Sequence, residues 1–284
     1  MARSPNSSPT IRFGPAGWSY KDWEGIVYPQ HGSKFDHLAY LAESFDTIEV
    51  NSSFYRIPPP AHGQSWVRRT ASNEHFRFTV KLFREFTHEK LPGTKQEGQF
   101  RDFLDPVHSA GKLGALLVQF PWSFRNDESA LTRIDRIAEA FRDFPLAVEV
   151  RHSTFQTAEF VRFLDERNIT FVNIDQPLFS DSVKPSTFAS GEIAYVRFHG
   201  RNYRKWFDHE EAWERYDYLY TPEELEPWAE RIGSLAEKQD VYVITNNHFR
   251  GQAIVNAIDL QHMMGLPYRV PPAMEELMKE RLEG

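Results

Sequence analysis

Charged and amide side chains stand at alternate positions where apolar segments of the sequence end. The segment Ile193–His199 is the clearest case, because its apolar and β-branched residues lead to Arg197 and His199, two positions apart. Alternate residues of a strand point to one face, so both side chains leave a strand on the same side. A charge at the end of a buried strand is costly unless it is paired or faces a wet cavity. The spacing therefore predicts a polar site at this point of the fold.

The same two-residue period selects polar side chains at the ends of other apolar segments. They are Glu49 and Asn51, Thr79 and Lys81, Gln119, Glu149 and Arg151, Asn173 and Asp175, and Thr245 and Asn247. If these segments are parallel strands of one barrel, the side chains converge on a single mouth. A single pair such as Glu149 with Arg151 fits an internal ion pair equally well. Burying the whole set without a cavity would be expensive, so the set favours a functional pocket.

These residue types suit acid–base chemistry on an anionic ligand. Glu49 or Glu149 could act as general acid or base, and His199 as a second proton-transfer group. Arg and Lys side chains bind phosphate or carboxylate and stabilise developing negative charge. The expected ligand-binding residues are Trp18, Asn51, Tyr55, Lys81, Gln119, Arg151, Asn173, Asp175, Arg197, Arg201, Asn247 and Arg250. We expect Arg197→Ala to abolish binding of a phosphate analogue and to leave the fold intact.

Two features of the loops support an anionic or ring-shaped ligand. The segment Asn247–Gln252 opens a helix after the last strand, where barrel proteins often seat a phosphate; alternatively, Gly251 only begins that helix and Arg250 is a solvated charge. Aromatic residues also gather just past the predicted strands: Trp18, Tyr20, Trp23, Phe54, Tyr55, Trp122, Trp206 and Phe249. Their flat faces suit sugar rings or bases, although each one alone could lock a loop onto the barrel. Four others are interpreted as packing residues: Trp213, Trp228, Tyr216 and Tyr218.

A divalent metal is possible but not favoured, and the sequence leaves the cofactor open. Glu49, Glu149, Asp175 and His199 are residue types that bind divalent metals at barrel mouths. No compact motif such as His-Glu-x-x-His is present, and interleaved Lys and Arg side chains could neutralise the acids without a metal. The absence of cysteine excludes disulfides, thiol catalysis and Cys-ligated metal.

Composition restricts the classes of partner. The chain has 284 residues and a formal net charge of −7, so its overall charge does not indicate nucleic-acid binding. No apolar run reaches the length of a membrane span, and the Ser/Pro/Asn-rich start does not read as a secretory signal. We therefore expect a cytoplasmic protein without a membrane partner. Residues 1–10 are expected to form a flexible tail.

Strand and helix patterns alternate along the rest of the chain. The expected strands are Ile11–Trp18, Asp46–Asn51, Phe76–Leu82, Gly114–Phe120, Leu146–Arg151, Thr170–Asp175, Ile193–His199 and Val241–Asn246. Eight such units predict an α/β fold, a (β/α)8 TIM barrel, as one domain over residues 11–284. The connection after Asp175 is short and Ser/Pro-rich, so its helix, the sixth, is expected to be vestigial. A doubly wound open sheet is the alternative, but no Gly-x-Gly-x-x-Gly follows the first strand. Residues 270–284 are expected to form a short charged helix outside the barrel.

Several blocks along the chain resemble the YecE-like family of bacteria and archaea, a family of unknown function. They include Gly14-x-x-Gly17-Trp18, Phe45–Pro58, Phe78–Lys81, Leu117–Phe124, Glu149–His152 and Tyr195–Arg201. The resemblance implies a TIM barrel, similar in shape to xylose-isomerase-like and endonuclease-IV-like barrels, and names no substrate. The zinc-ligand cluster of endonuclease IV is not evident here, so the resemblance does not imply zinc-dependent nuclease action.

The leading hypothesis is an enzyme that binds a phosphorylated or otherwise anionic small molecule. The pattern does not choose among hydrolase, isomerase and lyase chemistry. One alternative is a protein that binds or processes nucleic acid through the basic and aromatic segment Arg201–Phe207. Another is a barrel without catalysis that binds a partner protein.

Overall fold

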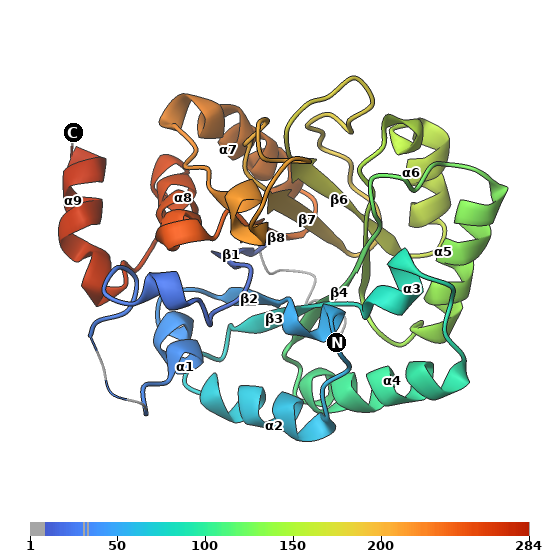
Figure 1. Ribbon diagram of the computed structural model, residues 1–284, viewed down its shortest axis with the longest axis horizontal. Coiled ribbons are helices and arrows are strands. Elements are labelled where there is room, and N and C mark those ends of the chain that lie inside the picture. Colours follow the sequence, from blue (N-terminus) through green and yellow to red (C-terminus); the bar gives the residue numbers. More distant parts are fainter. Residues whose placement is uncertain (1–8, 31, 33, 284) are drawn as a thin grey trace.

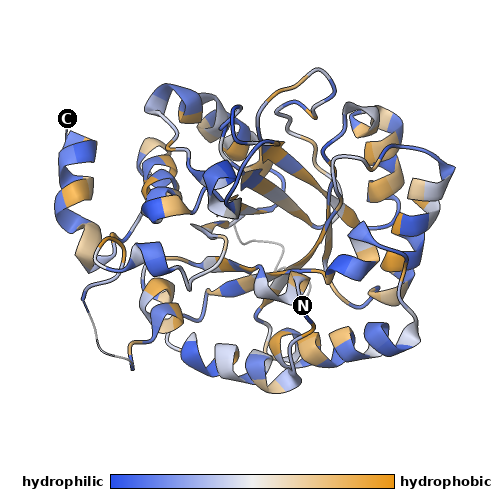
Figure 2. Cartoon of the chain, viewed as in Figure 1, coloured by the Kyte–Doolittle hydropathy of each residue, from blue (hydrophilic) through white to orange (hydrophobic). Residues whose placement is uncertain are grey.

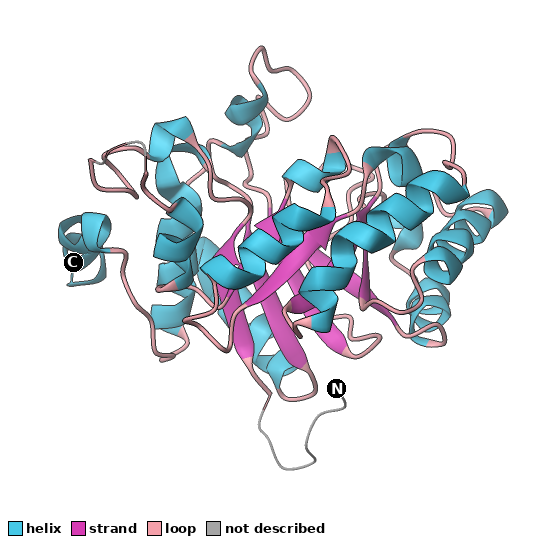
Figure 3. Cartoon of the chain, turned by 90° about the horizontal axis from the view of Figure 1, so that it is seen from below, coloured by secondary structure: helices cyan, strands magenta, loops and turns pink. Residues whose placement is uncertain are grey.

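Eight parallel strands form a nearly closed barrel at the centre of the molecule (Figures 1 and 3). The computed structural model describes residues 9–283 except 31 and 33. The strands are β1 (Ile11–Pro15), β2 (Thr47–Val50), β3 (Arg77–Lys81), β4 (Leu113–Gln119), β5 (Leu146–Glu149), β6 (Ile169–Asp175), β7 (Ile193–Phe198) and β8 (Asp240–Thr245). Their order around the sheet is β1-β8-β7-β6-β5-β4-β3-β2. The predicted (β/α)8 TIM barrel is confirmed.

The barrel closes where β1 meets β2, and two glycines permit the close approach. A Cβ atom on Gly14 would lie 1.7 Å from the carbonyl oxygen of Thr47, so no other residue fits without moving the backbone. Beyond β1, Ala16 forms a parallel bridge with Glu49, and the Gly17 N–H donates to the Glu49 carbonyl at 2.8 Å. Gly17 has a φ of +92°, which favours glycine. The closure therefore fixes the backbone of Glu49 beside the start of the first loop.

Helices cover the outside of the barrel, with their apolar faces turned to the strands (Figure 2). They are α1 (His37–Ala42), α2 (Pro60–Arg69), α3 (Arg84–His88), α4 (Thr94–Ser109), α5 (Glu128–Ala140), α6 (Ala158–Asp165), α7 (Pro222–Ala236), α8 (Gln252–Met263) and α9 (Glu275–Glu283). The start of α7 carries a capping box, in which Thr221 and Glu224 satisfy each other's backbone N–H groups.

The connection between β6 and β7 contains no helix in residues 176–192, all of which are described. The expectation that the sixth connection of the barrel, after Asp175, has only a vestigial helix is therefore confirmed; the helix labelled α6 belongs to the connection before it. At the other end of the chain, α9 lies outside the barrel next to α8 (Figure 1), as expected. Arg281 of α9 forms an ion pair with Asp259 of α8 at 2.9 Å, and Met278 is buried.

Two expectations about the rest of the chain concern the tail and the membrane. Residues 1–8 of the expected tail lie outside the described residues. Within the described part, no helix is both long enough and apolar enough to cross a bilayer.

Candidate functional site

A cavity of about 590 Å³ lies at the carboxyl ends of the strands. It is lined by Gly17, Trp18, Ser19, Tyr20, Asn51, Ser52, Tyr55, Lys81, Gln119, Arg151, Arg197, Glu211, Trp213, Tyr216, Asn246 and His248. Seven of the twelve expected ligand-binding residues are in this set: Trp18, Asn51, Tyr55, Lys81, Gln119, Arg151 and Arg197. Since they come from six different strand ends or following loops, the barrel brings together what the sequence separates.

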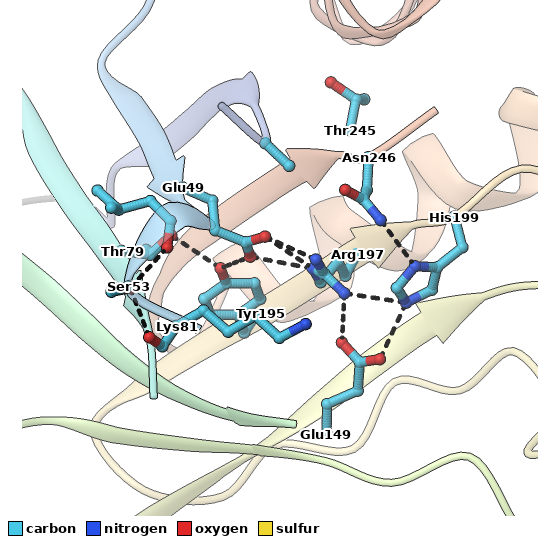
Figure 4. Close-up of polar contacts among 12 residues, drawn as sticks. Glu49, Ser53, Thr79, Lys81, Glu149, Tyr195, Arg197, His199, Thr245 and Asn246 are labelled. Carbon is cyan, nitrogen blue, oxygen red and sulfur yellow. Dashed lines mark hydrogen bonds and ion pairs between the residues drawn. The ribbon is translucent and has the colours of Figure 1, made fainter. Parts of the chain in front are cut away.

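The floor of the cavity is an ion-pair network centred on Arg197 (Figure 4). Its Nε donates to Glu49 Oε2 at 2.9 Å, and its Nη2 donates to Glu49 Oε1 at 2.6 Å, a two-pronged pair. Its Nη1 donates to Glu149 Oε2 at 2.9 Å. Glu49 also accepts a hydrogen bond from the Tyr195 hydroxyl at 2.8 Å. Both carboxylates are fully buried, and Arg197 pairs with both of them beneath the cavity surface.

His199 lies in the same layer and is neutral. Its Nε2 is 3.0 Å from Glu149 Oε1, and its Nδ1 is 3.2 Å from the side-chain nitrogen of Asn246. The tautomer that satisfies both contacts has Nε2–H donating to Glu149 and Nδ1 accepting from Asn246. Burial lowers the pKa of His199 to about 3, despite the opposing charge of Glu149. His199 therefore holds Glu149 in place as an uncharged ring.

Glu149 is the most heavily charge-stabilised acid of the network. Burial alone would raise its pKa, but Arg197, His199 and Arg151 outweigh burial and hold the pKa of Glu149 well below its ordinary value. Arg151 contributes through its Nε, which donates to Glu149 Oε1 at 3.1 Å. A carboxylate in this environment stays ionised and is a poor proton carrier near neutral pH.

Arg151 and Lys81 face the cavity and keep N–H groups that donate no hydrogen bond to the described residues. The guanidinium of Arg151 lies 5.5 Å from the ring centre of Trp206. Among the described residues, its two terminal nitrogens make no hydrogen bond, and neither does the amine of Lys81. Lys81 is half-buried and lies 3.9 Å from the ring centre of Phe54. Burial, with repulsion from Arg197, lowers the pKa of Lys81 to about 7.

Aromatic side chains form the rim of the cavity. Tyr20 stacks on His248 with ring centres 4.3 Å apart, and Trp213 stacks on Phe249 at 4.2 Å. Tyr55 is 71% exposed, so one ring face is open to a ligand. Exposed rings and cations line the same cavity, a combination that suits a planar or ring-shaped molecule carrying an anionic group.

The fold is shared with known proteins. The family model described as "Protein of unknown function DUF72" matches residues 12–280. The chain belongs to the DUF72 family. The resemblance named from the sequence blocks is thus confirmed at this level, and the narrower YecE-like name stays a prediction.

Relatives of this DUF72 chain cover almost all of it. It is 28% identical over 279 residues to the UPF0759 protein YunF of Bacillus subtilis (strain 168), covering 91% of this chain and 96% of that protein. The crystal structure of the DUF72 protein TM1631 of Thermotoga maritima is 32% identical with a TM-score of 0.81, covering 90% of this chain and 99% of that one. A crystal structure of the DUF72 protein EF0366 of Enterococcus faecalis is 26% identical with a TM-score of 0.80, covering 92% of this chain and 97% of that one. These matches show the family and its fold and name no reaction.

The side-chain direction expected for β6 is wrong. Asn173 pairs in register with Val196, and Asp175 with Phe198, so both point outward to the helices rather than into the barrel. Asp175 accepts hydrogen bonds from the Tyr220 hydroxyl at 2.6 Å and from the Trp228 indole N–H at 2.7 Å. A strand buried on both faces can carry polar residues on either face, and the two-residue period does not say which face is inward. Neither residue lines the cavity.

Asn173 and Arg201 also stabilise the fold on the outward side of β6. The Asn173 amide donates to the Phe188 carbonyl at 2.9 Å and so holds the helix-free connection against the barrel. Arg201 forms a two-pronged ion pair with Asp175 at 2.7 and 2.8 Å and does not line the cavity. The expectation that Arg201 adds to a cationic mouth is therefore not met, because Asp175 neutralises it.

The direction expected for the end of β8 is also wrong. Asn247 donates to the Tyr218 carbonyl and to Asn256, both at 2.8 Å, on the helix side of the barrel. Its neighbour Asn246 points to the cavity instead. Arg250 is exposed and lies away from the cavity. The helix start after β8 therefore brings no expected cation to this site.

Several lining residues were missed or underrated in the sequence. Trp213 and Tyr216, interpreted as packing, line the cavity, as do Tyr20, Asn246 and His248. Tyr20 was named among the aromatic residues past the predicted strands but not among the expected ligand-binding residues. His248 also follows a predicted strand, a signal that could have selected it. Trp213 and Tyr216 lie in the long loop after β7, where no periodic pattern indicates their position.

The described residues offer no cluster of metal ligands. Within them, no three His, Cys, Asp or Glu side chains come together in a way that could hold a metal ion. Of the four residues weighed as metal ligands, Asp175 points away from Glu49, Glu149 and His199.

Proposed function

We propose that the cavity binds a phosphorylated or otherwise anionic small molecule and carries out acid–base chemistry on it. One observation carries the proposal. Lys81, Arg151 and Arg197 line a single cavity, and the two buried acids beneath it are already paired with Arg197. Arg197 and Arg151 together balance the charges of Glu49 and Glu149, and Lys81 adds a further cation when it is protonated. Arg151 and Lys81 also keep N–H donors that face the cavity and bind no protein acceptor among the described residues. Anions bind where such charge is held in place in a partly desolvated site.

The roles differ from those expected from the sequence. Glu49 and Glu149 have no exposed surface and are held in ion pairs, so their part is to position Arg197 and Arg151. Lys81 is the better proton-transfer group, because its pKa of about 7 lets it gain or lose a proton near neutrality. His199 acts through Glu149 as a positioning residue.

Polar and aromatic groups around the cations suit a ligand with hydroxyls and a ring. The side-chain oxygen of Asn51 is buried at the cavity and has no hydrogen-bond partner among the described residues. A ligand hydroxyl could donate to it, which would satisfy a group that is otherwise costly to bury. Gln119 and Asn246 offer further amides, and Tyr55 offers an open ring face. A sugar phosphate has this combination of groups.

Calorimetry tests the proposal directly. We would titrate the protein with sulfate, with glucose 6-phosphate and with glucose. The two anions should bind and glucose should bind much more weakly. Arg151→Gln should weaken anion binding about tenfold or more, since a charge-assisted hydrogen bond is worth about 1.5–3 kcal/mol. Arg250→Gln, an exposed cation away from the cavity, is the matched control. Equal anion affinity in the parent and in Arg151→Gln would exclude the proposed site.

Nucleic-acid binding is the second candidate, because Tyr203 and Phe207 are 49% and 59% exposed near the cavity loops. Exposed aromatics can stack on unpaired bases. Against it, Arg201 is paired with Asp175, and Lys205 with Glu214 at 3.0 Å. Fluorescence anisotropy of a labelled single strand at low and moderate salt decides the matter, since backbone binding falls steeply with ionic strength. The third alternative, a barrel that only binds a partner protein, predicts no response to either ligand class.

A further inference from the structure

The amine of Lys81 is the only lysine amine among the described residues that lines the cavity. Lys81 is the last residue of β3, and its side chain points inward along with that of Thr79, which accepts a hydrogen bond from Tyr195. In Figure 4 the amino group of Lys81 carries no dashed line, whereas the carboxylates of Glu49 and Glu149 do. The amine is therefore held by its strand and its packing rather than by a partner.

Among the described residues, no carboxylate forms an ion pair with this amine. Glu49 is occupied by Arg197 and Tyr195, and Glu149 is occupied by Arg197, Arg151 and His199. The ring of Phe54 covers one side of the amine. An amine that is desolvated, beside cations and free of an acid partner loses its proton easily and becomes a nucleophile.

We propose that Lys81 forms an imine with an aldehyde or ketone whose anionic group is held by Arg151. This inference rests on the proposed anion site and adds the substrate class, a carbonyl compound bearing phosphate or carboxylate. The Nζ lone pair forms a bond to the carbonyl carbon, and the carbonyl electron pair moves to oxygen. The carbonyl oxygen then leaves as water with the two hydrogens of the amine, and a carbon–nitrogen double bond remains. No oxidant or reductant is needed.

The cavity meets the requirements of this reaction. Arg151 and Lys81 open into the same space, so a small molecule can contact both at once. At pH 7 about half of the Lys81 amines would be unprotonated, against about one in three thousand for a lysine with the ordinary pKa of 10.5. The imine would serve as an electron sink for proton abstraction or carbon–carbon bond cleavage next to the carbonyl, both of which are acid–base reactions.

Chemical trapping provides the experiment. The protein is treated at pH 7 with pyridoxal 5′-phosphate or with pyridoxal, the imine is reduced with sodium borohydride, and labelled peptides are mapped by mass spectrometry. Lys81 should be labelled at least about tenfold faster than the exposed Lys238, because burial beside cations lowers the pKa of Lys81 and a bound anionic group holds the reagent next to it. The phosphorylated reagent should label Lys81 faster than pyridoxal does, and sulfate should compete. Lys81→Arg should lose the label, and Lys238→Arg should keep it.

The outcomes separate the two proposals. If Lys81 reacts no faster than Lys238 with either reagent, the imine is excluded, and calorimetric binding of sulfate would leave the proposed anion site standing. If both reagents label Lys81 equally and sulfate does not compete, the reactive amine is supported and the anion site is excluded. Because the mapping is done on the parent protein, the result does not depend on whether a variant folds.

Discussion

Arg197 of β7 and Glu49 of β2 form a two-pronged ion pair inside the barrel, with N–O distances of 2.6 and 2.9 Å. The two residues are 148 positions apart in the sequence and belong to strands that are not neighbours. Their pair, extended to Glu149, links three strands beneath the cavity. This arrangement decides which charges are available to a ligand and which serve the fold.

Removal of the central guanidinium should destabilise the protein. Arg197→Met leaves Glu49 and Glu149 buried without their main partner, and breaking a buried pair costs about 3–5 kcal/mol. Urea unfolding should show this loss, whereas the exposed Arg250→Met should change the free energy of unfolding by less than about 0.5 kcal/mol. This predicted loss of stability replaces the expectation from the sequence that Arg197→Ala leaves the fold intact. A variant as stable as the parent would contradict the role of the network.

Acid destabilisation should be less steep without His199. The pKa of His199 is about 3 in the folded protein, below the ordinary 6.5, so the unfolded chain binds the proton first as pH falls. Stability attributable to His199 is therefore complete above pH 6.5 and falls as pH drops from 6.5 towards 3. His199→Gln should reduce the slope of unfolding free energy between pH 4 and 6 by about 1.4 kcal/mol per pH unit. An unchanged slope would mean that His199 is not held neutral.

Anion binding should weaken as pH rises through 7. Lys81 attracts an anion only while protonated, and its pKa of about 7 places the loss of that charge near neutrality. Sulfate is the suitable probe, because it keeps its charge over this range. Its affinity, measured by calorimetry between pH 6 and 8.5, should fall in the parent and stay nearly constant in Lys81→Met. A parent affinity that does not vary with pH would exclude Lys81 from the site.

Asp175 should matter to stability and not to ligand binding. It accepts hydrogen bonds from Tyr220 and Trp228 and pairs with Arg201 on the outer face of β6. Asp175→Asn leaves the buried end of this cluster without its charge and should cost about 3–5 kcal/mol in thermal or urea unfolding. Sulfate affinity at a temperature where the variant is folded should equal that of the parent. A selective loss of affinity would restore Asp175 to the ligand-binding residues.

The local sequence determined the barrel and much of the site. Eight alternations of apolar strands with amphipathic helices leave few architectures other than a (β/α)8 barrel. On β2, β3, β5 and β7 the inward face carries polar residues and the outward face is almost wholly apolar. The two-residue period therefore assigned Glu49, Lys81, Glu149, Arg151 and Arg197 to one mouth without structural help.

The tertiary structure alone decided which polar faces are inward and which charges cancel. On β6 the polar residues face the helices, where Tyr220 and Trp228 bind Asp175, and on β8 the inward amide is Asn246 rather than Asn247. Strand periodicity shows which residues share a face, but it does not show whether that face points into the barrel. When both faces are buried, the difference between an apolar and a polar face, which normally marks the inside, is lost. Pairing is likewise non-local: nothing near Lys81 in the sequence shows that Arg197, far along the chain, occupies both acids and leaves the amine free.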